Sequence, residues 1–197
     1  MSQTKLKSTI AILLVLGLGI FGFLPELALA EGTIEAYIYQ QGQDNQGDIV
    51  QEAYDNWAFQ YQVGDGNTAY IYQAGEGNSS SQSQIGNANT AYAEIIGYNN
   101  TTIQSQIGDG NSLFIQQSGS YNLLVQNQIG FENQAFAWVQ GSRNSINQHQ
   151  IGDRHSSRIT ITGDDNTVSH IQLGFGTELT LVQIGDNFEL GAIRFGF

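Results

Sequence analysis

The stretch Asn67-Thr68-Ala69-Tyr70-Ile71-Tyr72-Gln73-Ala74-Gly75 is one copy of a repeated unit from which the fold can be predicted. Asn67, Ala69, Ile71 and Gln73 lie two residues apart, so in an extended strand their side chains share one face. The residues that follow are rich in Gly, Asp and Asn, which is typical of a turn. An α-helix would scatter the alternating positions around its axis. The stretch therefore predicts a β-strand followed by a tight turn.

This unit recurs every 11 residues from Ile34 to the C-terminus without an insertion. A fixed period of this kind indicates a repeat architecture, in which each unit packs against its neighbours. A Gly begins nearly every turn, and Ala53 takes its place in the one exceptional unit. In most units Asn follows this position by three residues and Gln precedes it by two. The predicted turn glycines include Gly64, Gly86, Gly108, Gly130 and Gly152.

A longer period of 22 residues underlies the period of 11. The third inward position is apolar in alternate units, and in the units between it is Gln until His170 replaces it. Two kinds of strand therefore alternate along the chain. The simplest arrangement is an all-β fold, a β-solenoid of 22-residue strand-turn-strand rungs that form two stacked parallel sheets. The apolar series is Ile49, Ile71, Ala93, Ile115, Ala137, Ile159 and Leu181, and the Gln series is Gln60, Gln82, Gln104, Gln126 and Gln148.

Stacked rungs would place like side chains above one another. Gln and Asn amides in such columns can bond to each other, which satisfies polar groups that would be costly to bury unpaired. On the outer face of one sheet, Tyr70, Tyr92, Phe114 and Phe136 would form an aromatic column. The predicted self-assembly ladders consist of Gln62, Gln84, Gln106, Gln128, Gln150, Gln172, Gln73, Gln117, Asn67, Asn89, Asn111 and Asn133.

The N-terminal 30 residues have the layout of a secretory signal peptide. Lys5 and Lys7 give a positive start, residues 10–24 form an apolar run, and Ala28-Leu29-Ala30 is a small-x-small cleavage site. We predict cleavage after Ala30 and export of the remainder. Residues 1–30 are then the signal peptide, and residues 31–197 form one repeat domain.

The composition disfavours several classes of function. The chain has a formal net charge of −12, so it has no basic surface for nucleic acid. It has no Cys, and its three histidines, His149, His155 and His170, are not in metal-ligand spacing. The Asp residues that follow Gly are explained by turn formation. We therefore predict no enzyme activity, no cofactor and no metal site.

The ends of the predicted solenoid bear on its function. Each end of a stack of parallel strands carries unpaired N–H and C=O groups, which most proteins cover with a cap or protect with charge or Pro. Here the first unit begins at Ile34 and the last ends with the chain, and residues 31–197 contain no Pro. High β-propensity, low charge and absence of Pro are the signature of cross-β assembly. The sequence therefore predicts that copies of the chain assemble with each other.

The units also resemble a known family. The pattern Asn78-x5-Gln84-x-Gly86-x-x-Asn89-x-Ala91, repeated along nearly all of residues 31–197, is similar to the curlin repeat, with Asn where that repeat begins with Ser. This resemblance implies a subunit of curli, the extracellular amyloid fibres of the bacterial cell surface, which mediate adhesion and biofilm matrix formation. It also implies two partners besides the chain itself, a nucleator subunit and an outer-membrane secretion pore. The acidic composition is more like that of the major subunit than of the nucleator.

Two alternatives stay open from the sequence alone. An outer-membrane β-barrel would share the signal peptide, and Ile193, Phe195 and Phe197 imitate its last strand. Strands that cross a membrane need about 9–11 residues with an unbroken apolar face, which these units do not supply. A capped, monomeric β-solenoid that binds a ligand or ice is the second alternative, because Thr68 and Thr90 lie on one outer column.

Overall fold

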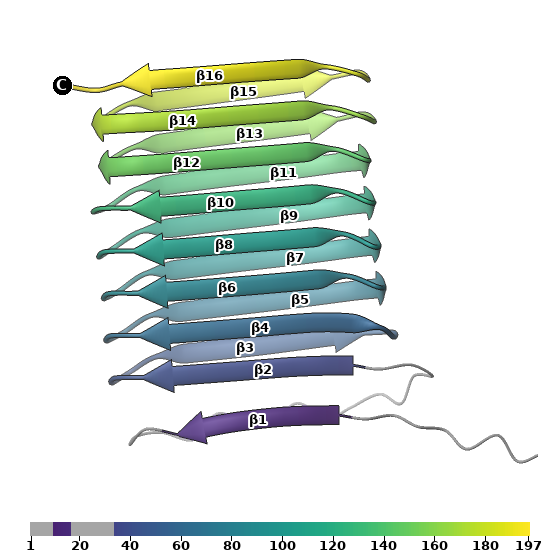
Figure 1. Ribbon diagram of the computed structural model, residues 1–197, viewed down its shortest axis with the longest axis vertical. Coiled ribbons are helices and arrows are strands. Elements are labelled where there is room, and N and C mark those ends of the chain that lie inside the picture. The colour runs from purple at the N-terminus through teal and green to yellow at the C-terminus, as the bar shows by residue number, and fades with distance from the viewer. Residues whose placement is uncertain (1–9, 17–33) are drawn as a thin grey trace, which may run out of the picture.

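The computed structural model of the chain describes residues 10–16 and 34–197, and every regular element in this part is a β-strand (Figure 1). In the same described part, no helix is long and apolar enough to span a membrane. The strands are β1 (Ile10–Leu16), β2 (Ile34–Gln41), β3 (Gln46–Glu52), β4 (Asn56–Val63), β5 (Thr68–Glu76), β6 (Ser79–Ile85), β7 (Thr90–Tyr98), β8 (Thr101–Ile107), β9 (Ser112–Ser120), β10 (Leu123–Ile129), β11 (Gln134–Ser142), β12 (Ser145–Asp153), β13 (Ser156–Thr162), β14 (Thr167–Phe175), β15 (Glu178–Ile184) and β16 (Glu189–Phe195).

The strands form two parallel sheets that face each other (Figure 1). Sheet A has nine strands in the order β1-β2-β4-β6-β8-β10-β12-β14-β16, and sheet B has seven in the order β15-β13-β11-β9-β7-β5-β3. The chain passes from one sheet to the other at each turn. From β2 onward, paired residues within a sheet are 22 apart, as in Gln106 opposite Gln128. This confirms the predicted β-solenoid of 22-residue rungs.

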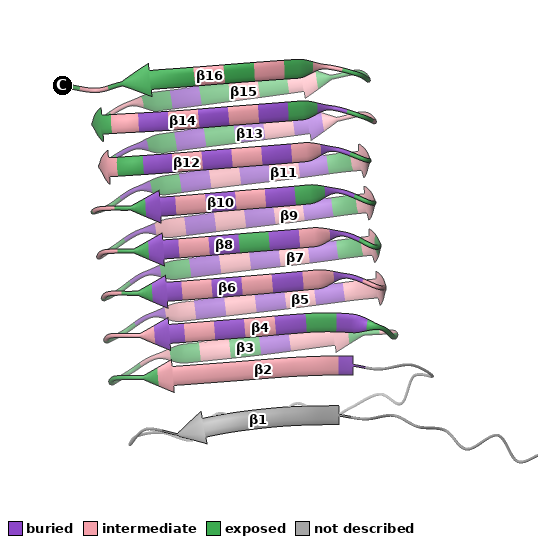
Figure 2. Cartoon of the chain, viewed as in Figure 1, coloured by how far each residue is buried: buried purple, intermediate pink, exposed green. Residues whose placement is uncertain are grey.

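Burial alternates along the strands from β4 to β14, as expected for strands with one face in a core (Figure 2). In β8, Thr102, Gln104 and Gln106 are buried, and the residues between them are exposed or half-buried. Apolar side chains of both sheets meet between the two faces. The two apolar clusters of the described core contain Ile115, Leu124, Val139, Ile146 and Ile161 in one, and Ile49, Ala58, Ile71, Ala93 and Ile95 in the other.

The turns explain why Gly recurs at a fixed position. Gly108 has φ = 117°, and a Cβ placed there would overlap the carbonyl oxygen of Gly130 in the next rung. Gly119, at the opposite turn, has φ = 127° and faces the carbonyl oxygen of Gly141 in the same way. The left-handed backbone and the close approach of the next rung both require a residue without a Cβ. The predicted glycines Gly64, Gly86, Gly108, Gly130 and Gly152 all have positive φ and face the next rung in this way.

At the N-terminal edge of sheet A, β1 pairs in parallel with β2, with Ile10 opposite Ile34. β1 lies within the predicted signal peptide, whose other residues, including the cleavage site at Ala30, lie outside the described residues. The signal peptide therefore stays a prediction. Cleavage after Ala30 would remove β1 and leave β2 as the first strand of sheet A.

Candidate assembly site: side-chain columns and strand edges

The predicted Gln residues of sheet A form an unbroken column. Gln62 Nε2 donates to Gln84 Oε1 at 2.8 Å, and the same bond links Gln84 to Gln106 at 2.9 Å and Gln106 to Gln128 at 3.0 Å. Gln128 to Gln150 and Gln150 to Gln172 are both 2.7 Å. The second N–H of each amide reaches sheet B, as Gln106 Nε2 does to the backbone oxygen of Thr90 at 3.0 Å. These buried amides are satisfied only because identical residues lie 22 positions away. A second column in sheet A runs in the same way through Gln60, Gln82, Gln104, Gln126 and Gln148.

The predicted Gln residues of sheet B, Gln73 and Gln117, are placed differently. Gln51 donates to Gln73 at 2.8 Å, but the next residue in the column is Ile95. Gln117 lies between Ile95 and Val139, so the expected Gln column is interrupted on both sides of it. The 11-residue motif suggested one rule for every Gln. In the structure, the identity of the residue 22 positions away decides whether a ladder forms.

Instead, Gln117 pairs across the core. Its Oε1 accepts a hydrogen bond from Thr102 Oγ1 at 2.9 Å, and its Nε2 donates to the backbone oxygen of Asn122 at 3.1 Å. Thr102 belongs to sheet A and Gln117 to sheet B. In the next rung the equivalent pair is Leu124 and Val139, which are both apolar. The sheet B position therefore accepts either a polar or an apolar pair.

The Asn columns line the turns. Asn89 Nδ2 donates to Asn67 Oδ1 at 3.1 Å and to the backbone oxygen of Gly108 at 2.7 Å, and the backbone N–H of Asn89 also donates to Asn67 Oδ1. The pattern repeats through the remaining predicted members of this column, Asn111 and Asn133. Each side chain thus binds a turn to the rungs on both sides.

His155 replaces Asn in this column without breaking it. Its backbone N–H donates to Asn133 Oδ1 at 3.0 Å, and its Nδ1 accepts from the backbone N–H of Thr177 at 3.2 Å. The other ring nitrogen, Nε2, lies 3.3 Å from the backbone oxygen of Ile151 and donates to it. Imidazole, with one donor and one acceptor nitrogen, substitutes for the amide.

His170 occupies the Gln position of sheet A next to Gln148. Its Nδ1 lies 3.1 Å from Ser157 Oγ, and its Nε2 has no hydrogen-bond partner among the described residues. Burial, with smaller contributions from Arg194 and His155, lowers the pKa of His170 from 6.5 to about 4. The ring is therefore neutral near pH 7, and it acts as part of the core.

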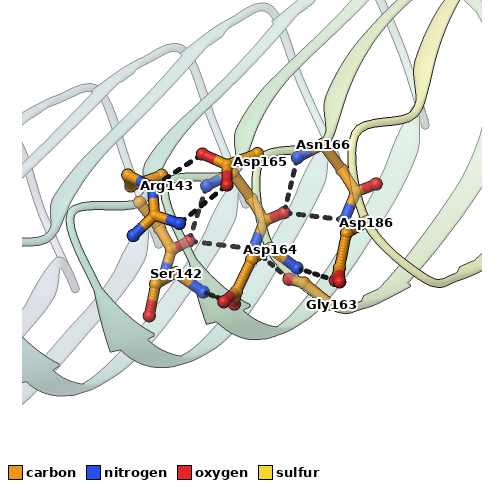
Figure 3. Close-up of polar contacts among 9 residues, drawn as sticks. Ser142, Arg143, Gly163, Asp164, Asp165, Asn166 and Asp186 are labelled. Carbon is orange, nitrogen blue, oxygen red and sulfur yellow. Dashed lines mark hydrogen bonds and ion pairs between the residues drawn. The ribbon is translucent and has the colours of Figure 1, made fainter.

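The Asp residues of the turns act as backbone acceptors (Figure 3). Asp164 Oδ1 accepts from the backbone N–H of Ser142 at 2.8 Å, and Asp186 Oδ1 accepts from that of Asp164 at 2.7 Å. Beside them, Arg143 forms two bonds of 2.6 and 2.7 Å to the Asp165 carboxylate, which lower the pKa of Asp165. Within the described residues, no cluster of acidic and histidine side chains could hold a metal ion.

Apolar columns cover parts of the outer faces. The predicted aromatic column is present on sheet B, where the rings of Tyr70, Tyr92, Phe114 and Phe136 stack with centroids 4.8–5.0 Å apart. On sheet A, the residue that precedes the turn Gly points outward and forms an exposed aliphatic column. Because this residue directly follows an inward Gln, the alternation of the strand places it on the outer face. The column includes Ile85, Ile107, Ile129 and Ile151, which are 43–46% exposed.

The strand edges at the two ends are the last part of the site. β3 is the first strand of sheet B, and its Gln51 Oε1 is buried without a hydrogen-bond partner in the described structure. At the other end, β15 and β16 expose Val182 and Ile193 to 61% and 59%. Arg194, in β16, donates from Nη1 to the backbone oxygen of Glu178 at 2.7 Å. Both ends therefore present backbone edges together with open ends of the side-chain columns.

A comparison with known families agrees with this geometry. Residues 42–75, which include β3 and β4, match the model of the curlin associated repeat family. The match covers 34 of the 197 residues and shows similarity to this family over about one and a half rungs. The matched segment of this chain carries residues of the columns and turns described above, namely Gln51, Gln62, Gln73, Gly64, Gly75, Asn45, Asn56 and Asn67. No curated protein and no solved structure matched the chain in the corresponding searches.

Proposed function

We propose that this curlin-repeat chain is the structural subunit of an extracellular, curli-like amyloid fibre. The backbone ladders of both sheets and the sheet A column from Gln62 to Gln172 run along the solenoid and end at strand edges, which supports the proposal. A further copy can extend both sheets with the same backbone and amide hydrogen bonds that hold the rungs together. This mode of growth needs no catalytic group, and the curlin family is a structural one.

The proposed fibre lies at the bacterial cell surface, where residues 31–197 arrive by export through an outer-membrane pore, and it acts in adhesion and biofilm matrix formation. Curlin family members are extracellular fibre subunits, which supports this location. The chain would act as the major subunit, with a nucleator subunit as its partner at the surface. Even spacing of the amide columns over the central rungs supports a major, self-propagating subunit.

Assembly of the exported chain by itself tests the proposal. We expect the processed protein, at tens of micromolar, to form fibres that bind thioflavin and that seed fresh protein. Electron microscopy and fluorescence would follow the growth. A chain that stays monomeric for days, with seeds present, would instead favour the capped solenoid that binds a ligand.

A further inference from the structure

The number of strands constrains how two copies can join. Strands alternate between the sheets, and apart from β1 the described chain has eight strands in sheet A and seven in sheet B. The first strand, β2, and the last, β16, therefore lie in the same sheet. If a second copy stacked in the same orientation with its β2 on β16, one strand position would stay empty between β15 and β3 of the next copy. An empty position would leave buried N–H and C=O groups unpaired, which is costly.

We propose that successive copies join head to tail with a half turn about the fibre axis, so that sheet A of one copy continues sheet B of the next. This inference rests on the proposed fibre. β2 of the next copy then pairs with β15, and β3 of the next copy pairs with β16. No strand position is left empty. The register follows from the 22-residue step: Leu181 lies opposite Ile38 of the next copy, Gln183 opposite Gln40 of the next copy, and Arg194 opposite Gln51 of the next copy.

The buried acceptor at the N-terminal end supports this junction. In the Gln columns each Nε2 donates to the Oε1 that lies 22 residues later, so the first Gln of a column lacks a donor. Gln51 Oε1 is such an unpaired, buried acceptor. The half turn brings the guanidinium of Arg194 against it. Because Arg carries five N–H donors and the structure uses one of them on Glu178, donors remain for this acceptor.

The two terminal strands of sheet A also carry the residue pattern of sheet B. At the third inward position, sheet A has Gln60 and its equivalents, whereas β2 has Ile38 and β16 has Ala192. Within one copy Ile38 fits poorly, since Gln60 Oε1 above it is buried without a partner. Across the half-turn junction, Ile38 of the next copy meets Leu181, and Ala192 meets Ile49 of the next copy. Both contacts join apolar side chains, as at the equivalent positions throughout sheet B.

One contact opposes the junction. Glu178 would lie opposite Glu35 of the next copy on the outer face, and like charges in opposing positions repel. These side chains are at the surface, so salt screens the repulsion. We therefore expect faster elongation at 0.15 M salt than at 0.01 M. The junction also requires that β1 no longer covers β2, which the predicted cleavage after Ala30 would achieve.

Pairs of introduced cysteines distinguish the half-turn junction from two junctions without rotation, one that leaves a strand position empty and one that displaces β16. The chain has no Cys of its own, so only the introduced residues can form disulfides. Tyr39→Cys is common to all three variants. In the half-turn junction, Val182→Cys would lie opposite Tyr39→Cys of the next copy. In the straight junction with the empty position, Ile193→Cys would lie opposite Tyr39→Cys of the next copy. If β16 were displaced and β2 of the next copy paired with β14 in its place, Ile171→Cys would lie opposite Tyr39→Cys of the next copy.

The full chain with each pair is exported, processed, assembled and then oxidised, and covalent multimers are measured after dissolution of the fibres. Because a disulfide needs Cα atoms within about 7 Å, we expect at least about tenfold more multimers for Tyr39→Cys/Val182→Cys than for either other pair. A majority of multimers from another pair, or fibres without multimers from any pair, would overturn the half turn while leaving the fibre itself established. Failure of the unsubstituted chain to form fibres would instead reject the proposed function, and this inference with it.

A measurement on the unsubstituted fibre gives an independent check. Helical reconstruction by electron microscopy should give a rise of roughly 36 Å per subunit, seven and a half strand spacings of about 4.8 Å, with a rotation of about 180° plus the sheet twist. A rotation equal to the sheet twist alone would contradict the proposal.

Discussion

Sheet A and sheet B face the same core but fill it with different columns. In sheet A, Gln62 to Gln172 form a continuous ladder in which each amide depends on the next. In sheet B, the equivalent position is Gln in some rungs and Ile or Val in others, and Gln117 bonds to Thr102 across the core instead. A ladder is a property of the whole column, whereas a cross-core pair is a property of one rung. A change in the sheet A ladder should therefore disturb the rungs on both sides, whereas replacement of both partners of a cross-core pair should be tolerated.

The largest effect should come from the turns, which serve both sheets equally. Gly108→Ala and Gly119→Ala would each place a Cβ on the carbonyl oxygen of the next rung, at a positive φ. We expect each to cost more than about 3 kcal/mol, and the two costs to be similar. Denaturant titration of assembled protein measures both.

Gly110→Asn is the matched control for the turns. Gly110 has φ = 67°, and a Cβ there would meet only Glu132 Cγ at 3.6 Å. Asn tolerates this left-handed conformation, so the change should cost less than about 1 kcal/mol. A large loss from Gly110→Asn would show that the turns are constrained by something other than the close approach of rungs.

The next largest effect should come from the sheet A ladder. Gln106→Leu and Gln128→Leu together would leave Gln84 without its acceptor and Gln150 without its donor, both in the buried core. At about 1–3 kcal/mol for each orphaned group, the double variant should lose about 2–6 kcal/mol and elongate more slowly. Thioflavin kinetics measure the slower elongation, and denaturant midpoints measure the loss of stability.

The outward neighbours Ser105 and Asn127 are the control for the ladder. Ser105→Ala and Asn127→Ala together remove side chains that lie on the outer face of the same strands. We expect much smaller changes in elongation and stability. Equal effects of the inward and outward pairs would refute the assignment of faces.

A pH-dependent effect of intermediate size should come from His170. Its pKa is about 4 in the folded chain, against the ordinary histidine value of 6.5, so below pH 6.5 the unfolded chain binds a proton that the folded chain does not. Stability should therefore fall as pH drops from about 6.5 to 4, by up to about 3 kcal/mol. His170→Gln, which restores the residue type of the column, should remove this component.

The difference between the pH profiles of the original chain and His170→Gln isolates this histidine from the carboxylates. His149, on the outer face of the neighbouring strand, serves as a control. His149→Gln should leave most of the loss between pH 6.5 and 4 in place. Superimposable profiles for the original chain and His170→Gln would contradict the account.

The smallest effect should come from the polar pair of sheet B. Thr102→Leu and Gln117→Val together reproduce the Leu124–Val139 pair of the next rung. Because both partners become apolar, we expect a change within about 1 kcal/mol. Gln117→Val alone should cost more, since it leaves the buried Thr102 hydroxyl unpaired. If this double variant lost as much stability as Gln106→Leu with Gln128→Leu, the predicted difference between the two sheets would be wrong.

The sequence predicted the architecture because each rung repeats the same physical requirements. The alternation around Ile71 fixed the inward face, and the 22-residue period fixed which strands stack. The exceptions depended on neighbours that the motif does not show. Gln117 matches the motif but has no Gln above or below it, whereas His155 departs from the motif and keeps its hydrogen bonds. The buried acceptor of Gln51 became visible only when the strand edges were placed in space.

In the proposed fibre, the rungs of successive copies stack into one continuous pair of sheets. Diffraction from aligned fibres of the exported chain measures this stacking. We predict a meridional reflection at about 4.7–4.8 Å, from strands perpendicular to the fibre axis, and an equatorial reflection near 10 Å from the two facing sheets. A soluble product, or fibres whose 4.7–4.8 Å reflection lies on the equator, would contradict it.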